Sequence, residues 1–259
     1  SAGRSRNVIY RAIRLLSVAT QMWLYMVWRR PALAHFFLPA SYLVGAPVAL
    51  LAGIKRRVMS RRSLNRYQLA RPMAARIERK LHRFTTAILA NSKRVMTQLI
   101  DEEHVDASRS AVIYNGVETP QAIGVAERLE RRESLGIAPP SLVMVITANL
   151  IPYKGHADLL HACASVKSQL PGNWRLLVIG RDDGIGESLK TLCTEPQIAA
   201  NVVFLGERGD VSKILQAADI GLLVSHEEGF SNALLECMAA GLPSVATDVG
   251  GNAEAVRDG

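Results

Sequence analysis

The segment SLVMVITANLIPYKGHADLLHACASVKSQLPGNWRLLVIG, residues 141–180, shows how the second half of the chain is built. Apolar runs at 142–148 and 175–179 are each bounded by Asn, Pro or Gly, as buried strands commonly are. The stretch between them, 157–169, has the length and pattern of a helix. Strands that alternate with helices predict a parallel sheet whose crossover connections are right-handed.

The same alternation continues to the end of the chain and also occurs before residue 120. We expect further strands at 202–205, 220–224 and 244–247, and helices at 186–194, 211–218 and 231–240. Parallel sheets bind ligands beyond the carboxyl ends of their strands, so functional residues are sought in the loops after each strand. The fold class is therefore α/β.

The first half predicts a second layered α/β domain. Short strands are expected at 56–60, 86–90 and 111–114, with helices at 72–84 and from Ser92 to about residue 103. The pattern loosens between Val117 and Ser141, so we place a domain boundary there and divide the chain into residues 1–120 and 121–259.

Two apolar segments near the start of the chain raise the question of a membrane. Phe36 to Ile54 is uncharged over nineteen residues, but its prolines and glycines favour a strand, a turn at Pro39 and a buried helix over a spanning helix. Upstream, Ile9, Ile13, Leu16, Trp23 and Val27 follow helical spacing. This stripe predicts a surface helix packed on the sheet, and a helix lying on a membrane is the alternative.

Composition and charge narrow the possible partners. The 259 residues are 49% hydrophobic and 21% charged, which is ordinary for a globular protein. Three widely spaced cysteines indicate neither a disulfide framework nor a zinc site, and they favour a reducing, cytoplasmic compartment. Residues 1–120 carry a net charge of +14 and the remainder −6. A basic half can bind a phosphorylated substrate or an anionic membrane, or it can be a solvated surface with no partner. Aromatic residues are only 5%, which argues against nucleic acid.

Two of the expected loops contain residues suited to binding an anionic ligand. The loop after 142–148 contains Asn149 and Lys154, and a lysine at a strand end can neutralise phosphate oxygens; a solvated lysine is the alternative. The stretch after 220–224 is Glu227-Glu228-Gly229-Phe230-Ser231-Asn232, followed by Glu236. Its serine or asparagine can begin a helix whose free N–H groups bind an anion. The two carboxylates Glu228 and Glu236 would then contact different parts of one ligand, or else only support the helix and face solvent. The chain contains no Asp-x-Asp pair, so we predict no metal site.

The order of these motifs resembles the retaining glycosyltransferases of family 4, which have the GT-B architecture of two facing Rossmann-like domains with parallel sheets. The resemblance runs from about His35 to Gly259. It rests on Asn115-Gly116-Val117, the Lys154-Gly155 loop, the Glu-x7-Glu element at 228–236, and Gly241-Leu242-Pro243 followed by Asp248-Val249-Gly250-Gly251. The family's first strand, its glycine-rich loop and its closing helices do not appear in the sequence. The resemblance therefore implies a fragment truncated at both ends, with a partial acceptor-side domain at 1–120 and a partial donor-binding domain at 121–259.

The resemblance implies a role for each matching residue. Lys154 and the segment Gly229-Phe230-Ser231-Asn232 would hold the diphosphate of a nucleotide-sugar donor, Glu236 the ribose and Glu228 the transferred sugar. Many members have arginine where this chain has Asn149, so either the diphosphate has one fewer cation than usual or another basic residue supplies that charge. His35 matches a histidine that some members place near the sugar, although a buried structural histidine is an equal alternative.

The resulting expectation is a sugar transferase that uses a UDP- or GDP-sugar without a further cofactor and acts on a glycan or lipid-linked acceptor in cell-surface polysaccharide synthesis. We place it in the cytoplasm, with possible peripheral contact at the inner face of the plasma membrane. A GT-B sugar-nucleotide epimerase and a non-catalytic binding subunit of the same fold are the alternatives.

Overall fold

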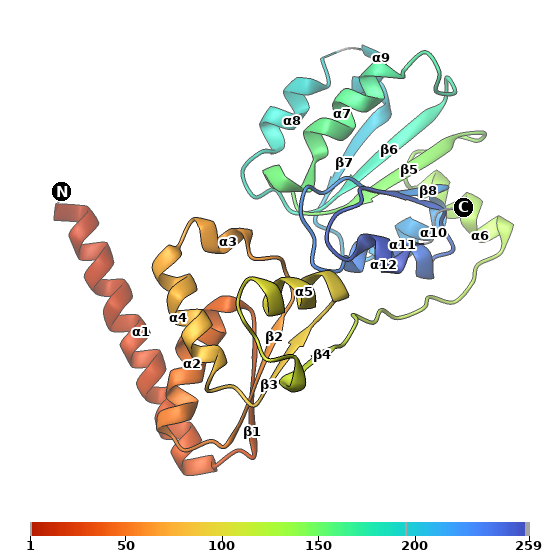
Figure 1. Cartoon of the computed structure of the whole chain (residues 1–259). Coiled ribbons are helices and arrows are strands. Elements are labelled where there is room, and N and C mark those ends of the chain that lie inside the picture. The colour runs from red at the N-terminus through yellow and green to blue at the C-terminus, as the bar shows by residue number, and fades with distance from the viewer. Residues whose placement is uncertain (1, 195, 257–259) are drawn as a thin grey trace. The chain divides into compact units, whose positions relative to one another are not determined.

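The computed structural model describes residues 2–194 and 196–256; side chains are described from Tyr10 onward, except those of residues 196 and 197 (Figure 1). The chain divides after Tyr114 into two compact units. Each unit is an α/β layer structure around its own parallel sheet. The division lies six residues before the boundary predicted at residue 120, so the segment that follows Tyr114 belongs to the second unit.

The first unit has a parallel sheet in the order β1-β2-β3-β4, in which each strand pairs with the next along the chain. Helices connect successive strands, as the alternating pattern predicted. The elements are α1 (Ala2–Arg29), β1 (Leu33–Phe37), α2 (Pro39–Leu51), β2 (Arg56–Arg61), α3 (Arg66–Leu69), α4 (Pro72–His82), β3 (Ala87–Ala90), α5 (Lys93–Asp101), η1 (Ala107–Arg109) and β4 (Ser110–Val112).

Strand β1 and helix α2 confirm the predicted strand and buried helix, but Pro39 and Gly45 do not interrupt the helix. Pro39 is the first residue of the helix instead of a separate turn, a position where proline loses no hydrogen bond. Gly45 lies inside the helix, where a Cβ atom would come within 2.4 Å of the Phe36 ring. The glycine therefore lets α2 pack closely on β1. Within the described residues, no helix is both long and apolar enough to cross a membrane.

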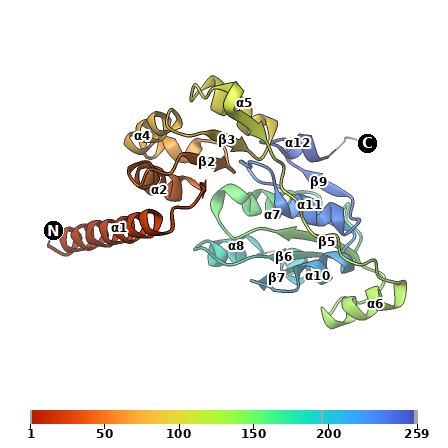
Figure 2. The same cartoon turned by 90° about the horizontal axis from the view of Figure 1, so that it is seen from below.

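Helix α1 packs through a different face from the predicted one. Ala19, Met22 and Met26 join the core of the first unit, whereas Ile13 and Leu16 of the predicted stripe are 62% and 70% exposed. The side chain of Ile9 lies outside the described residues. Figures 1 and 2 show the N-terminal part of α1 extending away from the sheet of its own unit. Helix α1 therefore leaves an apolar face without a partner among the described residues.

A closed group of charged side chains lies at the carboxyl end of β2. Both terminal nitrogens of Arg61 bind the Glu103 carboxylate at 2.9 Å, and one of them also binds Glu78 at 2.9 Å. His82 Nε2 lies 2.9 Å from Glu103, and the Tyr67 hydroxyl donates to Glu78 at 2.8 Å. The side chains of Arg61, Glu78 and Glu103 are each 1% exposed. These charges are paired with one another inside the unit, while the buried Nε of Arg61 has no hydrogen-bond partner among the described residues.

The second unit has a parallel sheet in the order β7-β6-β5-β8-β9, so the strand order reverses direction beside β5. Ligands bind at such a switch point in open α/β sheets. The elements are α6 (Val125–Ser134), β5 (Leu142–Thr147), η2 (Pro152–Lys154), α7 (His156–Ser165), β6 (Trp174–Ile179), α8 (Gly186–Leu192), α9 (Pro196–Asn201), β7 (Val202–Gly206), α10 (Val211–Ala217), β8 (Ile220–Leu223), α11 (Asn232–Ala239), β9 (Ser244–Ala246) and α12 (Asn252–Ala255).

Helices cover both faces of this second sheet. Alternate residues along a strand point to opposite faces. Met144 and Ile146 of β5 accordingly pack in one core cluster with residues of α7 and α8, and Val143 and Val145 pack in another with residues of α10. A strand buried on both faces reads as a continuous apolar run, which is why the sequence showed these strands clearly.

Candidate functional site

The loop after β5 is held against the segment that follows β8. Gly155 has φ +72°, and a Cβ atom there would lie 2.0 Å from the carbonyl oxygen of Val224. The backbone N–H of His226 donates to the carbonyl oxygen of Tyr153 at 2.8 Å. Only glycine fits this close backbone approach. Gly155 therefore fixes the backbone position of the neighbouring Lys154.

Lys154 and Glu228, predicted from two separate loops, form an ion pair. Lys154 Nζ lies 2.6 Å from Glu228 Oε1, and the two side chains are 19% and 10% exposed. The lysine nitrogen also lies 5.3 Å from the centre of the Tyr153 ring. Partial burial strengthens the attraction and keeps both groups accessible. An anion that reached this place would compete with Glu228 for the lysine.

The stretch Gly229 to Asn232 leads into α11 as the sequence predicted. Ser231 is the N-cap, and its hydroxyl accepts from the backbone N–H of Leu234 at 3.4 Å. Glycines of the next loop support the turn, since Gly251 N–H donates to Gly229 O at 3.0 Å. Gly250 has φ +58°, and a Cβ atom there would lie 1.8 Å from Glu228 O. Two loops therefore fix the backbone at the amino end of α11, close in sequence to Glu228.

Asn115 makes contacts that the sequence did not reveal. Its Nδ2 donates to the carbonyl oxygen of Phe230 at 3.0 Å and to Asn232 Oδ1 at 2.7 Å. The sequence showed Asn115-Gly116-Val117 only as a motif of the family resemblance, because nothing in the chain's spacing links positions more than a hundred residues apart. The asparagine thus ties the segment after Tyr114 to the start of α11.

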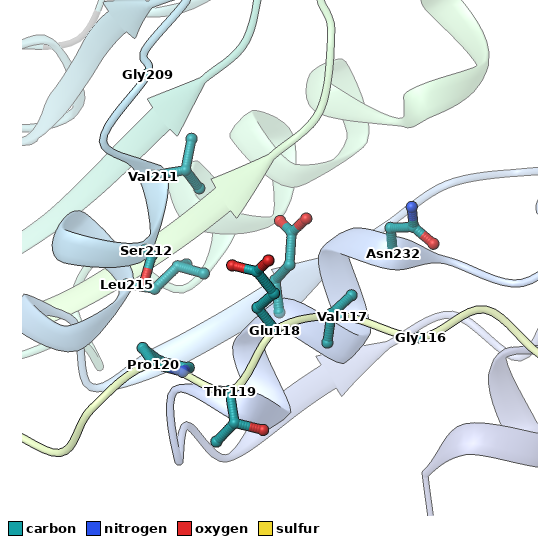
Figure 3. Close-up of a pocket in the computed structure, with 11 residues that line it drawn as sticks. Gly116, Val117, Glu118, Thr119, Pro120, Gly209, Val211, Ser212, Leu215 and Asn232 are labelled. Carbon is teal, nitrogen blue, oxygen red and sulfur yellow. The ribbon is translucent and has the colours of Figure 1, made fainter.

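A pocket of about 480 Å³ contains Glu236 on its wall (Figure 3). Burial raises the pKa of this half-buried carboxyl group. Sequence reasoning did not identify most of the lining, which comes from the segment after Asn115, from Gly209 and from helix α10. The lining residues are Gly116, Val117, Glu118, Thr119, Pro120, Gly209, Val211, Ser212, Leu215, Asn232 and Glu236.

Asn149 lies between the ends of β5 and β6 and has charged neighbours. Its Nδ2 donates to Asp183 at 3.3 Å, and its Oδ1 accepts from the backbone N–H of Arg181 at 3.3 Å. The Arg181 side chain in turn binds Asp183 at 2.7 Å, and this pairing holds the pKa of the aspartate below its usual value. Arg181 is therefore a basic residue beside the position where family members often have arginine.

His35 lies in the first unit, in the middle of β1. Its Nε2 is 2.8 Å from Ser60 Oγ, and its ring is 4.1 Å from that of Phe37. The side chain is exposed. The alternative of a buried histidine bonded to backbone is therefore wrong.

A second histidine, His156 at the start of α7, was not singled out from the sequence. Its burial, together with the nearby charge of Lys154, lowers its pKa.

The arrangement brings together a lysine, carboxylates and the capped start of a helix. In the described part of the chain, no group of three or more His, Cys, Asp or Glu side chains is placed to hold a metal ion. A lysine, a helix N-terminus and carboxylates can stabilise an anionic leaving group and bind hydroxyls.

Family models match both units of the chain. The model described as glycosyltransferase family 4 matches residues 2–121, and that described as glycosyl transferases group 1 matches residues 141–259. Together they span nearly all of both units.

Individual relatives agree with the family models. The D-inositol 3-phosphate glycosyltransferase of Mycobacterium marinum is 32% identical over 66% of this chain, and that of Mycolicibacterium gilvum is 30% identical over 73%. The chain spans 37% and 42% of these two proteins' lengths.

Solved structures show the same fold. Anabaena HepE in complex with UDP and glucose has a TM-score of 0.79, with 24% identity over 95% of this chain and 65% of that one. Sucrose-phosphate synthase from Thermosynechococcus elongatus has a TM-score of 0.74, with 19% identity over 92% of this chain and 61% of that one. The fold is that of GT-B glycosyltransferases, and the chain belongs to the family 4, or group 1, glycosyltransferases.

Proposed function

We propose that the protein transfers a sugar, with retention of configuration, from a nucleotide diphosphate-sugar to a glycan or lipid-linked acceptor. The observation that carries this proposal is the Lys154–Glu228 pair at 2.6 Å, in which Glu228 lies just before the capped helix α11 in sequence. The same helix brings Glu236 to the wall of a pocket of about 480 Å³. Groups for a phosphate, a sugar and a nucleoside thus come from one continuous segment and the loop after β5.

The names of relatives support the choice of substrate. Relatives such as that of Mycobacterium marinum are named D-inositol 3-phosphate glycosyltransferase. Anabaena HepE was solved with UDP and with UDP-glucose. A UDP- or GDP-sugar is accordingly the donor class we propose, without a further cofactor, for a role in cell-surface polysaccharide synthesis.

The mechanism follows from the charges of the site. As the donor binds, Lys154 would exchange Glu228 for the diphosphate, and the N–H groups at the start of α11 would receive its other oxygens. Both interactions strengthen as negative charge develops on the departing diphosphate, so they lower the barrier. The leaving phosphate would take the acceptor's proton on the same face. Glu228, released from the lysine, would accept hydrogen bonds from the sugar.

The test uses full-length protein with labelled UDP- and GDP-sugars and a panel of glycan and lipid-linked acceptors. Transfer of the label with retained anomeric configuration supports the proposal. Release of an epimerised sugar nucleotide would indicate an epimerase, and saturable binding with no turnover would indicate a binding subunit. Chelation of divalent ions should leave the chemical step unchanged.

Two substitutions separate the roles of the carboxylates. Glu236→Ala should weaken nucleoside diphosphate binding in calorimetry. Glu228→Ala should not weaken that binding, because it removes the carboxylate that competes for Lys154, but it should lower transfer. Equal loss of nucleoside diphosphate binding in both variants would place Glu228 at the nucleotide and contradict its assigned role at the sugar.

The first unit supports a proposal about location. We propose a cytoplasmic protein in peripheral contact with an anionic membrane at the inner face of the plasma membrane. Residues 1–120 carry a net charge of +14. Helix α1 exposes Ile13, Leu16 and Trp28 together with Arg11 and Arg14. Basic and apolar side chains on one helix suit the headgroup region of such a membrane.

A further inference from the structure

The pocket beside α11 is acidic. Glu118 and Glu236 both line it, and none of its eleven lining residues, all within the described chain, is basic. Ionised carboxylates only accept hydrogen bonds. They repel phosphate, so the pocket suits a part of a ligand that is uncharged and rich in O–H or N–H donors.

Glu118 lies on a segment that is fastened to the second unit on both sides. Before it, Asn115 binds the carbonyl oxygen of Phe230 and the side chain of Asn232. After it, Gln216 Nε2 of α10 donates to the carbonyl oxygen of Gln121 at 2.6 Å. The backbone between these anchors forms one wall of the pocket, and Figure 3 shows Glu118 on that wall. The carboxylate therefore belongs to a fixed surface of the second unit, although it comes from the segment that joins the two units.

Among the described residues, Glu118 forms no ion pair and no side-chain hydrogen bond, and its side chain is exposed. Its partner across the pocket, Glu236, is half-buried, and burial raises the pKa of that carboxyl group. Both carboxylates line the same pocket, so one ligand that carries O–H or N–H donors can donate a hydrogen bond to each of them. The pocket that contains these two carboxylates is where the nucleoside of the donor would lie in the proposed function.

We propose that Glu118 is a second nucleoside-binding carboxylate, which accepts a hydrogen bond from a ribose hydroxyl or a base N–H of the donor and so adds to the affinity given by Glu236. This inference rests on the proposed function and deepens it. The diphosphate lies at Lys154, where a cation is available, and the neutral nucleoside lies between the two carboxylates. The segment that joins the units thereby becomes part of the donor site.

The first experiment measures binding of UDP and GDP to the full-length protein by calorimetry, and the nucleotide that binds is used for the variants. Glu118→Ala should weaken its binding about tenfold or more, as expected for loss of a hydrogen bond to a charged group. Glu118→Gln, which keeps an oxygen acceptor but not the charge, should lose less. Glu187→Ala is the matched control, because Glu187 lies on α8 and its side chain is 88% exposed. Inorganic pyrophosphate should bind wild type and Glu118→Ala equally.

Nucleotide analogues then identify the donated hydrogen. The 2′-deoxy, 3′-deoxy and ring N-methylated forms of the nucleotide are measured against wild type and Glu118→Ala. The analogue that lacks the donor should lose affinity for the wild type and show little further loss with the variant. Thermal unfolding of each variant checks that the fold is retained.

The outcomes distinguish the two proposals. Wild-type protein that binds neither UDP nor GDP would overturn both. Glu118→Ala with unchanged nucleotide affinity would overturn the role of Glu118 and leave the proposed transferase standing. Equal loss of pyrophosphate and nucleotide affinity would also overturn it, because the effect would then concern the diphosphate.

Discussion

Charged residues at the strand ends of the two sheets differ in how deeply they are buried and in how many partners they have. In the first unit, Arg61 ends β2 and is enclosed with Glu78 and Glu103, each with 1% of its side chain exposed. In the second, Lys154 and Glu228 pair with each other and keep 19% and 10% of their side chains exposed. Both groups lie where a parallel sheet offers its ligand edge. Position alone therefore does not identify a functional charge.

The difference lies in how many partners each cation has. Arg61 binds two carboxylates, so a ligand would have to break several short bonds to reach it. Lys154 binds one carboxylate from an adjoining loop, and exchange of that single partner for a phosphate conserves its charge pairing. A closed network indicates a structural role, and an open pair indicates a binding role.

The largest effect on stability is expected from Arg61→Ala. The substitution leaves Glu78 and Glu103 buried without their cation, which typically costs about 3–5 kcal/mol of the free energy of unfolding. Urea unfolding measures this loss. Arg62→Ala, at an exposed neighbouring position, should change stability by less than about 0.5 kcal/mol. A loss below about 1 kcal/mol for Arg61→Ala would mean that the network is not structural.

Lys154→Ala should lower the turnover rate, whereas Arg61→Ala lowers stability. Removal of one group that stabilises a developing oxyanion typically lowers kcat about 10²–10³-fold. Lys154→Arg keeps the charge and should retain more activity. Lys190→Ala serves as the control for loss of a lysine, because the Lys190 side chain on α8 is 56% exposed. Normal turnover by a stable Lys154→Ala protein would contradict the proposed catalytic role.

The acid stability of the first unit tests the closed network by a different route. Burial works to raise the pKa of Glu103, but the hydrogen bond from His82 and the charge of Arg61 lower it from 4.5 to about 2. A carboxyl whose pKa is lower in the folded state stabilises the fold above its unfolded pKa and loses that contribution as pH falls through the folded value. The free energy of unfolding should therefore decline as pH falls from 4.5 toward 2.

Urea unfolding between about pH 6 and pH 3.5 follows the upper part of that decline. Glu103→Gln should be less stable than wild type at neutral pH and should show a flatter dependence on acid. Glu187→Gln is the control, since that side chain is 88% exposed. An unchanged slope in Glu103→Gln would assign the acid sensitivity to other groups.

Sequence patterns predicted the strands and the long helices of both units because each leaves a repeating signal. Strands β5 and β6 are buried on both faces and read as apolar runs, and α11 begins at a residue able to cap it. The short helices α3, α9 and α12 were missed, since four to six residues are too few to show a period.

Other features depend on contacts that no local pattern records. Helix α1 has apolar residues on several sides, so spacing could not show that Ala19, Met22 and Met26 form the packed face. Asn115 and Glu118 approach α11 only through the fold. The candidate lysine and glutamates came from the family resemblance and from loop position, and the structure added their partners.

The smallest effect is expected at the surface of the first unit, where charges are neither enclosed nor paired across a pocket. If α1 rests on an anionic membrane, each arginine near the surface contributes about 1 kcal/mol of attraction, or about fivefold in binding. Arg11→Gln and Arg14→Gln should each weaken sedimentation with phosphatidylserine vesicles by that factor and have little effect with neutral phosphatidylcholine vesicles. Arg208→Gln in the second unit is the control, because Arg208 is partly exposed and paired with Asp210. High salt should reduce wild-type binding, since exposed charges are screened over about 10 Å at 0.1 M salt. Binding that ignores lipid charge, salt and both substitutions would leave the basic half of the chain without a membrane role and favour a phosphorylated acceptor as its partner.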